Sequence, residues 1–488
     1  MNEKREIANN NMIFIAGNVA AAALAFLFNI MAAALLQPEQ FGILSFAIVV
    51  MGFFTVFTDP GIGPTVTKFL ASYIAKGERG RARSLVGFFI SVRLGLTVAV
   101  AAVMLVFSTP LAAFFGKPEY VTFIDFSAAM LLTSALISIA YTVLEGLKKF
   151  KIETAIKLFE RVTRILFVFI FILMGMGATG AVVGVTLSFL LAGMIGMVLF
   201  RRKDDIFSAK KEPVEKSLLF SFGAWALIGS TINALYFSID SIMVSALRPV
   251  IEIGFYSIAS AWVSLATYIT PISAAVMYPY FSSLSREKNT KALDRSIRYA
   301  LLAAMPVAFL ISAFSGTIIS VFYKNSFMPA SAALGVLSFV SIPLAIEPLM
   351  MAYLYGVGRP KTHTKIVSVI FAANILLTYF AIGAFGLWGA ALTIVAMRLV
   401  EVALLLGAIY LKPARHFDIG VVLKPLAASL VIFAAASLIP VSGLVELVAC
   451  GLALMAVYVG LMLVVGGIEK NDVTMALDWL RSLKIRKG

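Results

Sequence analysis

Residues 179–216 read TGAVVGVTLSFLLAGMIGMVLF followed by RRKDDIFSAKKEPVEK, an apolar run of 22 residues and then a basic stretch of 16. A helix needs about 20 apolar residues to cross the roughly 30 Å core of a bilayer. This run is the sixth of fourteen, which cover residues 12–36, 41–75, 83–107, 122–145, 154–175, 179–200, 217–246, 252–281, 293–316, 331–355, 363–383, 386–411, 420–440 and 443–467. Apolar residues make up 61% of the chain, against about 45–50% in soluble domains. The sequence therefore predicts an all-α polytopic membrane protein with 14 transmembrane helices.

The positive charge falls in alternate gaps between these runs. Of the 40 lysines and arginines, 31 lie in residues 1–11, 76–83, 146–157, 201–216, 282–295, 356–365, 411–424 and 468–488, and only three lie in the opposite gaps. Cytoplasmic loops carry the excess of positive charge in membrane proteins. We therefore expect a multi-pass protein of the cell membrane with both termini in the cytoplasm. Loops that face anionic headgroups account for most of the net charge of +15, so we expect no nucleic-acid partner.

The chain contains an internal repeat. Helix two begins GILSFA at residue 42 and helix eight begins GFYSIA at residue 254, an offset of 212 residues, and residues 146–166 match residues 356–376 at an offset of 210. Six helices are an even number, so the two halves have the same orientation, as in transporters built from parallel repeats. The sequence predicts six-helix lobes at 1–200 and 217–411, a cytoplasmic linker at 201–216, two further helices at 412–467 and an amphipathic cytoplasmic tail at 468–488.

Short motifs follow one another in a recognisable order over predicted helices one to twelve. They are Ala16-Gly17-Asn18, Pro38-Glu39-Gln40-Phe41-Gly42, Asp59-Pro60-Gly61-Ile62-Gly63, Asp240, Ile253-Gly254-Phe255-Tyr256-Ser257-Ile258-Ala259, Tyr278-Pro279-Tyr280-Phe281-Ser282 and Gly358-Arg359-Pro360-Lys361. As an ordered set they resemble the polysaccharide transporter (Wzx-type flippase) family of the MOP superfamily, which also contains MATE antiporters and the lipid II flippase. One departure is that members often carry an arginine near the end of helix one, whereas residues 29–37 contain none.

This resemblance implies two lobes in a V shape, alternating access and no ATPase machinery. It implies a polyprenyl-(pyro)phosphate-linked oligosaccharide as cargo, moved to the outer leaflet for cell-surface polysaccharide or glycan assembly. A MATE-type cation or drug antiporter and a lipid II flippase-like transporter are the alternatives. A membrane enzyme of the same pathway would need a large outer loop or a catalytic motif, and the outer loops reach only about 14 residues. We expect no catalytic residue, a monomer, and membrane lipids and polysaccharide-assembly proteins as partners.

Cations deep within the apolar runs are the candidates for binding the cargo. Each costs about 2.5–3.5 kcal/mol at the bilayer centre and should face water, an acidic partner or an anionic ligand. Arg93 has no acidic partner nearby in the sequence and suits a phosphate, whereas Lys68 can instead extend to the interface. The other two cations are Arg164 and Arg398. A glutamate lies four residues before Arg164, and another lies three residues after Arg398, so local ion pairing is the alternative for both.

Carboxylates and amides supply the remaining candidates. We expect coupling to Na⁺ or H⁺ at Asp59, Asp240 or Glu347. Glu347 lies between two prolines that free backbone carbonyls, with a salt bridge as its alternative role. Asp59 precedes PGIGP at residues 60–64, and this segment must bend the long run 41–75, so Asp59 can equally be a turn residue. Asp240 can instead cap a helix or form an ion pair at the outer surface. The candidate sugar contacts are Asn18, Asn29, Asn233 and Asn374.

The sequence indicates no metal site. His363 and His416 lie in or beside cytoplasmic loops without neighbouring ligands in the sequence. The single cysteine, Cys450, lies inside an apolar run, which excludes an internal disulfide and a cysteine-built site. We therefore expect no cofactor apart from a coupling ion.

Overall fold

The computed structural model describes residues 2–59, 61–202, 205–213, 231–232, 234–236, 238–267, 277, 281, 286–410 and 417–468. In these ranges the regular structure is helical, as predicted, and twelve segments are long and apolar enough to cross a membrane. One of them, Phe150–Arg201, runs over 52 residues and contains two successive predicted helices. The predicted total of 14 is not confirmed, because the seventh predicted helix, 217–246, lies partly outside the described residues.

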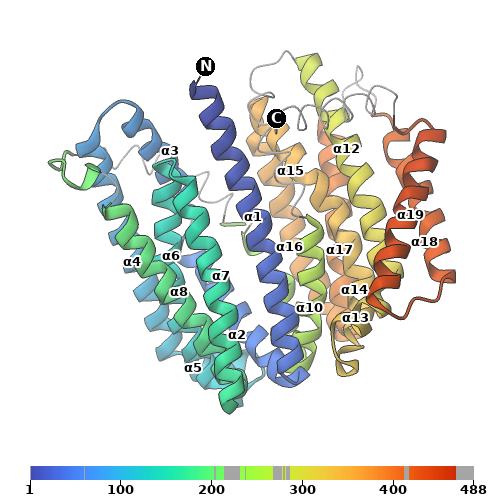
Figure 1. The fold of residues 1–488 in the computed structure, drawn as a ribbon, viewed down its shortest axis with the longest axis horizontal. Coiled ribbons are helices and arrows are strands. Elements are labelled where there is room, and N and C mark those ends of the chain that lie inside the picture. The colour runs from blue at the N-terminus through green and yellow to red at the C-terminus, as the bar shows by residue number, and fades with distance from the viewer. Residues whose placement is uncertain are drawn as a thin grey trace. The chain divides into compact units, whose positions relative to one another are not determined.

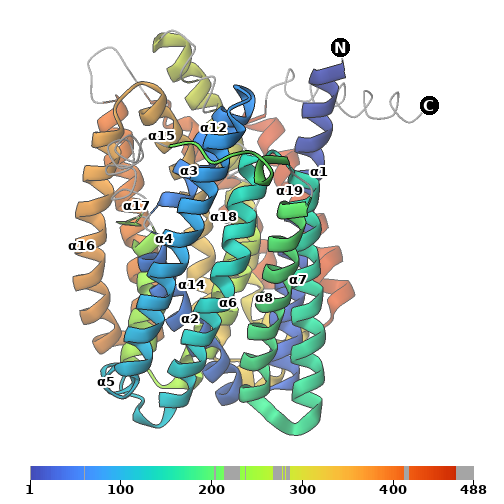
Figure 2. The same cartoon turned by 90° about the vertical axis from the view of Figure 1, so that its left-hand side faces the viewer.

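The chain forms two compact units, and the first comprises Met1–Ala261 and Val367–Thr393. Its helices include α1 (Asn2–Leu35), α2 (Pro38–Thr58), α3 (Ile62–Ala75), α4 (Arg79–Val106), α5 (Ser108–Phe114), α6 (Val121–Gly146), α7 (Phe150–Phe171), α8 (Gly177–Arg202) and most of α10 (Val250–Thr267). Helix α6 packs against α2, α3, α4 and α8, and Figure 2 shows it among them. Leu70, Phe89, Ile139 and Phe200 are buried in this core, where close packing of apolar side chains holds helices together in lipid.

The second unit comprises Trp262–Ile366 and Ile394–Gly488. It contains α12 (Arg286–Ala313), α13 (Ser315–Phe322), α14 (Ala330–Leu337), α15 (Ser341–Gly356), α18 (Gly420–Leu438) and α19 (Leu444–Val464). Helix α12 packs against α15 and α18, and α18 packs against α19 (Figure 1). Two helices, α16 (Pro360–Phe385) and α17 (Leu387–Tyr410), each have residues in both units. The predicted boundaries of the lobes, linker and tail stay predictions.

The predicted bend in the run 41–75 is present. Helix α2 ends at Thr58, and Gly61 adopts a left-handed conformation with φ of 75° before α3 begins at Ile62. The backbone N–H of Gly63 donates to Oδ1 of Asp59 at 3.2 Å. A side-chain oxygen that accepts from the start of a helix stabilises that start. The structure therefore confirms Asp59 as a turn residue.

Two further turns of the first unit repeat one another. Helices α7 and α8 are joined through Gly175, with φ of 82°, and Gly177, with φ of 53°. Helices α16 and α17 are joined at Gly386, with φ of 60° and 211 residues after Gly175. Side chains disfavour positive φ, so glycine permits both short reversals. Their spacing matches the offset of the sequence repeat.

The two glycines that revealed the repeat contact each other. A Cβ atom on Gly254 of α10 would lie 3.2 Å from Cα of Gly42 of α2, and a Cβ atom on Gly42 would lie 2.1 Å from the carbonyl oxygen of Val250. The obstructing atoms belong to the backbone and cannot rotate away. Small residues allow membrane helices to approach at such distances. The GILSFA and GFYSIA segments therefore form one helix–helix contact.

The Gly42→Ala variant should be destabilised by about 1–3 kcal/mol, because its Cβ atom forces α2 and α10 apart. The matched control is Gly52→Ala on the same helix, where a Cβ atom meets nothing within 4 Å and alanine is the better helix former. Thermal unfolding in detergent should show a lower midpoint for the first variant only. Equal midpoints would show that the helices move apart at little cost.

Candidate functional site

Arg93, the first candidate cation, forms a non-local ion pair at the bend of the first unit. Its Nη1 lies 3.3 Å from Oδ2 of Asp59, and the Arg93 side chain is 4% exposed. Its Nε is buried without a hydrogen-bond acceptor among the described residues. A guanidinium carries five N–H donors in a planar fork, so one carboxylate leaves donors for a second anionic group. The break between α2 and α3 thus places a coupling candidate beside a substrate candidate.

Arg164 belongs to a charged stripe along one face of α7. Its Nε donates to Oε1 of Glu160 at 2.8 Å, and its guanidinium lies 4.7 Å from the ring centre of Phe189 and 5.6 Å from that of Phe28. The local pair anticipated from the i, i+4 spacing is therefore present. Nε of Arg161 also lies 3.4 Å from Oε2 of Glu160, so that two guanidinium groups share one carboxylate.

The stripe continues one turn toward the start of α7. Lys157 forms an ion pair with the fully buried Glu153, its Nζ donates to Oδ1 of Asn18 at 3.3 Å, and it lies 5.2 Å from the ring centre of Tyr141. The sequence analysis named Asn18 but missed Lys157 and Tyr141. The i, i+4 spacing of Glu153 and Lys157 was the available signal. Over residues 153–164 the stripe holds three cations and two carboxylates.

A neutral amide and a carboxylate meet between α16 and the helical residues 238–247 of the first unit. Nδ2 of Asn374 donates to Oδ1 of Asp240 at 3.2 Å, and the hydroxyl of Thr378 donates to Oδ1 of Asn374 at 3.2 Å. Asp240 is 2% exposed, and the other two residues are fully buried. The Asp240 carboxylate therefore lies in the interior, where it accepts from the Asn374 amide that Thr378 in turn holds.

Four ionisable side chains gather in the second unit. Nε2 of His363 lies 2.8 Å from Oε1 of Glu347, and Nη1 of Arg398 donates to Oε2 of Glu401 at 3.1 Å. One potential ligand atom from each of Glu347, His363 and Glu401 lies within 4.8 Å of the others. The expectation that His363 lacks partner ligands was wrong, because α15 and α17 supply carboxylates that are 16 and 38 residues away in sequence. Arg398 has the local pair that its spacing suggested.

The remaining candidates are more dispersed. Lys68 is exposed on α3, and its Nζ lies 5.9 Å from the ring centre of Phe69. Asn29 is half-buried on α1. Asn233 and His416 lie outside the described residues. The roles of these residues, and those of the other candidate cations and carboxylates, stay predictions.

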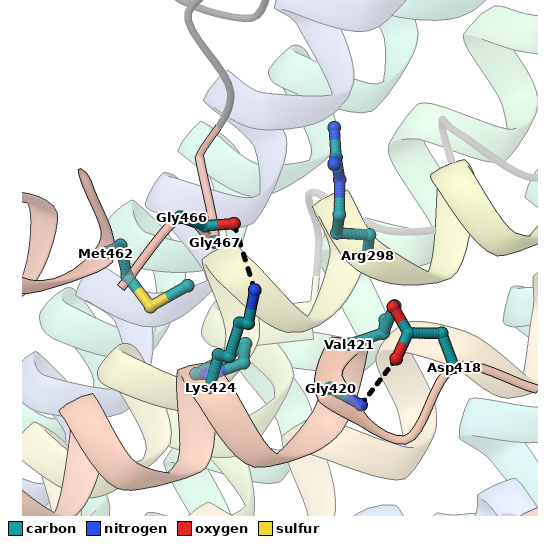
Figure 3. Close-up of a pocket in the computed structure, with 9 residues that line it drawn as sticks. Arg298, Asp418, Gly420, Val421, Lys424, Met462, Gly466 and Gly467 are labelled. Atoms are coloured by element: carbon teal, nitrogen blue, oxygen red, sulfur yellow. Dashed lines mark hydrogen bonds between the residues drawn. The ribbon is translucent and has the colours of Figure 1, made fainter. Parts of the chain in front are cut away.

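An open pocket lies among α12, α18 and α19 (Figure 3). Arg298 and Lys424 line it, and Nζ of Lys424 donates to the carbonyl oxygen of Gly466 at 3.2 Å. Asp418 accepts from the backbone N–H of Gly420 at 2.9 Å. Charged residues at the ends of spanning helices are typical of the membrane surface, and nothing in this pocket selects a cargo.

The Asp59→Asn variant should lose about 3 kcal/mol of stability, because it leaves the buried Arg93 charge without its carboxylate. Asparagine keeps the oxygen that accepts from Gly63. In the Asp59→Asn/Arg93→Gln double variant, most of the stability should return. A double-mutant cycle by thermal unfolding in detergent measures the coupling, and independent, additive effects would show that the pair contributes nothing.

Comparison with known proteins places this fold. A family model described as "Polysaccharide biosynthesis protein" matches residues 7–285, more than half of the chain. The chain is 24% identical over 396 residues to a putative O-antigen transporter of Shigella flexneri, covering 78% of this chain and 92% of that protein. It is 21% identical over 392 residues to Agl15, a probable low-salt glycan biosynthesis flippase of Haloferax volcanii, covering 79% and 80%.

Among solved structures, the lipid II flippase MurJ in an inward closed conformation matches with a TM-score of 0.75 at 14% identity, covering 92% of this chain and 98% of that one. This likeness shows a shared fold. It agrees with the family match, which contains all of the motifs except Gly358-Arg359-Pro360-Lys361. This multi-pass membrane protein therefore belongs to the polysaccharide biosynthesis protein family, as its motifs predicted.

Proposed function

We propose that this protein is a flippase, not an enzyme, that moves a polyprenyl-(pyro)phosphate-linked oligosaccharide from the cytoplasmic to the outer leaflet of the cell membrane by alternating access. Membership of the family and the names of its relatives, an O-antigen transporter and a glycan biosynthesis flippase, support this class of cargo. The alternation of basic and neutral loops supports cytoplasmic termini. The protein acts as a monomer beside polysaccharide-assembly proteins.

The observation that carries the proposal is the excess of positive charge inside the first unit. Lys157 is balanced by Glu153, which has Glu145 as a further neighbour. Arg161 and Arg164 share the one carboxylate of Glu160, and Arg93 has a donor to spare. Such an excess in an apolar environment is stabilised by an anion. A guanidinium binds phosphate oxygens with two parallel hydrogen bonds. A phosphate-linked cargo supplies the missing negative charge.

Coupling to a cation supplies the driving force in this proposal. Asp240, one candidate for this coupling, is a buried carboxylate that accepts from the amide of Asn374, and buried carboxylates suit Na⁺ or a proton. The alternative, a MATE-type antiporter of cationic drugs, requires a net acidic site. Arg161 and Arg164 with their shared Glu160 have the opposite sign, which favours the flippase.

Loss of Arg93 should slow lipid flipping at least tenfold, because a charge-assisted hydrogen bond contributes about 1.5–3 kcal/mol and about 1.4 kcal/mol corresponds to a factor of ten. The variant is Asp59→Asn/Arg93→Gln, in which both side chains at the bend are neutral and similar in shape to the originals. The measurement is the initial rate of flipping of a fluorescent lipid-linked oligosaccharide in proteoliposomes.

Lys151→Gln is the matched control, since it removes one exposed cation at the start of α7. It should retain the wild-type rate. An undiminished rate in the double variant would remove Arg93 from the binding site. Exchange of a cationic dye by the wild-type protein without any lipid flipping would favour the antiporter instead.

A further inference from the structure

The cluster of Glu347, His363, Glu401 and Arg398 has features that ion pairing alone does not explain. All four residues lie in the second unit, on α15, α16 and α17. His363 and Glu347 are 4% exposed, Arg398 is 2% exposed and Glu401 is 1% exposed. Three helices therefore bring a histidine and two carboxylates together away from water, although burying a charge requires a partner.

One carboxylate oxygen of this cluster has capacity for another partner. Oε2 of Glu401 accepts from Arg398, whereas its Oε1 is buried without a hydrogen-bond donor among the described residues. The ligand atoms of Glu347 and His363 lie within 4.8 Å of that of Glu401. An unsatisfied, fully buried carboxylate oxygen costs free energy and therefore points to a species that occupies the space between the three groups.

The charges of the cluster specify that species. With a neutral imidazole, two carboxylates and one guanidinium leave one negative charge. The ring of Tyr355 packs edge-on against His363, with 5.6 Å between the ring centres, and a phenol contributes no charge near neutral pH. Binding one monovalent cation would make the buried cluster neutral, whereas a divalent metal ion would leave it positive beside Arg398.

We propose that this cluster binds and releases one proton during the transport cycle, with the imidazole of His363 as the carrier between Glu347 and Glu401. The proposal rests on the proposed function, of which it makes the coupling ion specific. The proton comes from water on one side of the membrane, forms an N–H bond on the ring and returns to water on the other side.

A proton suits these groups better than Na⁺. Sodium is a hard cation that takes several oxygen ligands, and one of the three ligand atoms here is an imidazole nitrogen. Histidine is the side chain that ordinarily gains and loses a proton between pH 5 and 8. The 2.8 Å contact between Nε2 and Glu347 becomes an ion pair when the ring is protonated.

The location of the site links the proton to helix movement. Glu347 lies on α15 beside Pro348, just after the 3₁₀ segment Ser338–Val340, and prolines weaken the hydrogen bonding of a helix. His363 lies three residues before α16 passes from the second unit to the first, and Arg398 lies four residues after α17 makes the reverse passage. Protonation stabilises the closed cluster, and deprotonation leaves a buried net charge that favours its opening to water.

The presence of only two histidines allows a direct test. In protein labelled with ¹³C-histidine, the His416→Gln variant leaves the ring signal of His363 alone. We expect this signal to change with pH in detergent, because the proposed cycle adds a proton to the ring and removes it. In Glu347→Gln, the protonated fraction of the His363 ring should fall several-fold at the pH that protonates half of the rings in the wild-type protein. The reason is that the neutral amide no longer stabilises the imidazolium. Glu347→Gln and His363→Gln both leave the Arg398–Glu401 pair in place, which favours folding. Monodispersity and the midpoint of thermal unfolding check that each variant is folded.

A ring signal that ignores pH would overturn the proposal. The proposal would also fail if the ring signal stayed constant with pH but broadened with micromolar Mn²⁺ or shifted with Zn²⁺. That result would make the cluster a metal site. This NMR experiment needs no cargo, so its result holds whether or not the protein flips lipids.

The second arm measures flipping in proteoliposomes with and without a pH gradient. The gradient should accelerate wild-type flipping, and in His363→Gln this acceleration should vanish while flipping without a gradient persists. The control His416→Gln should behave as wild type. A gradient response retained in His363→Gln would refute the proton site and leave the flippase intact, whereas no flipping by the wild-type protein would refute the proposed function alone.

Discussion

A charge surrounded by apolar helices must meet another charge or a hydrogen bond, and this requirement organises the polar interior of the protein. Lipid offers no compensation for a bare guanidinium or carboxylate. Arg93, Arg164 and Arg398 each contact a carboxylate of their own unit. These three arginines are therefore paired and not surrounded by lipid alone. They belong to small clusters whose net charge decides what else can bind.

These clusters differ in sign. In the first unit, Arg161 and Arg164 share the single carboxylate of Glu160. The cluster around His363 in the second unit instead has one negative charge when the ring is neutral. An excess of positive charge suits an anionic cargo, and a deficit suits a cation. Under the proposed function, the anionic cargo and the coupling cation would therefore use separate clusters of the chain.

The sequence predicted what depends on short range. Apolar runs of spanning length predicted the helices, the PGIGP segment predicted the bend, and i, i+4 or i, i+3 spacing predicted the pairs of Arg164 and Arg398. The pairs Asp59–Arg93 and Glu347–His363 were not predicted, because residues 34 and 16 positions apart meet only when separate helices pack. A single sequence contains no measure of that packing, so His363 was taken for a loop residue.

The contact between Gly42 and Gly254 also bears on the symmetry of the repeat. In a dimer of identical six-helix subunits with a two-fold axis along the membrane normal, a residue near the axis meets its own copy. The only residue that allows two helix backbones to touch there is one without a side chain. Gly42 and Gly254 occupy equivalent positions of the repeat and still touch. The contact therefore places the two glycines as a two-fold axis would place one residue of two identical six-helix units.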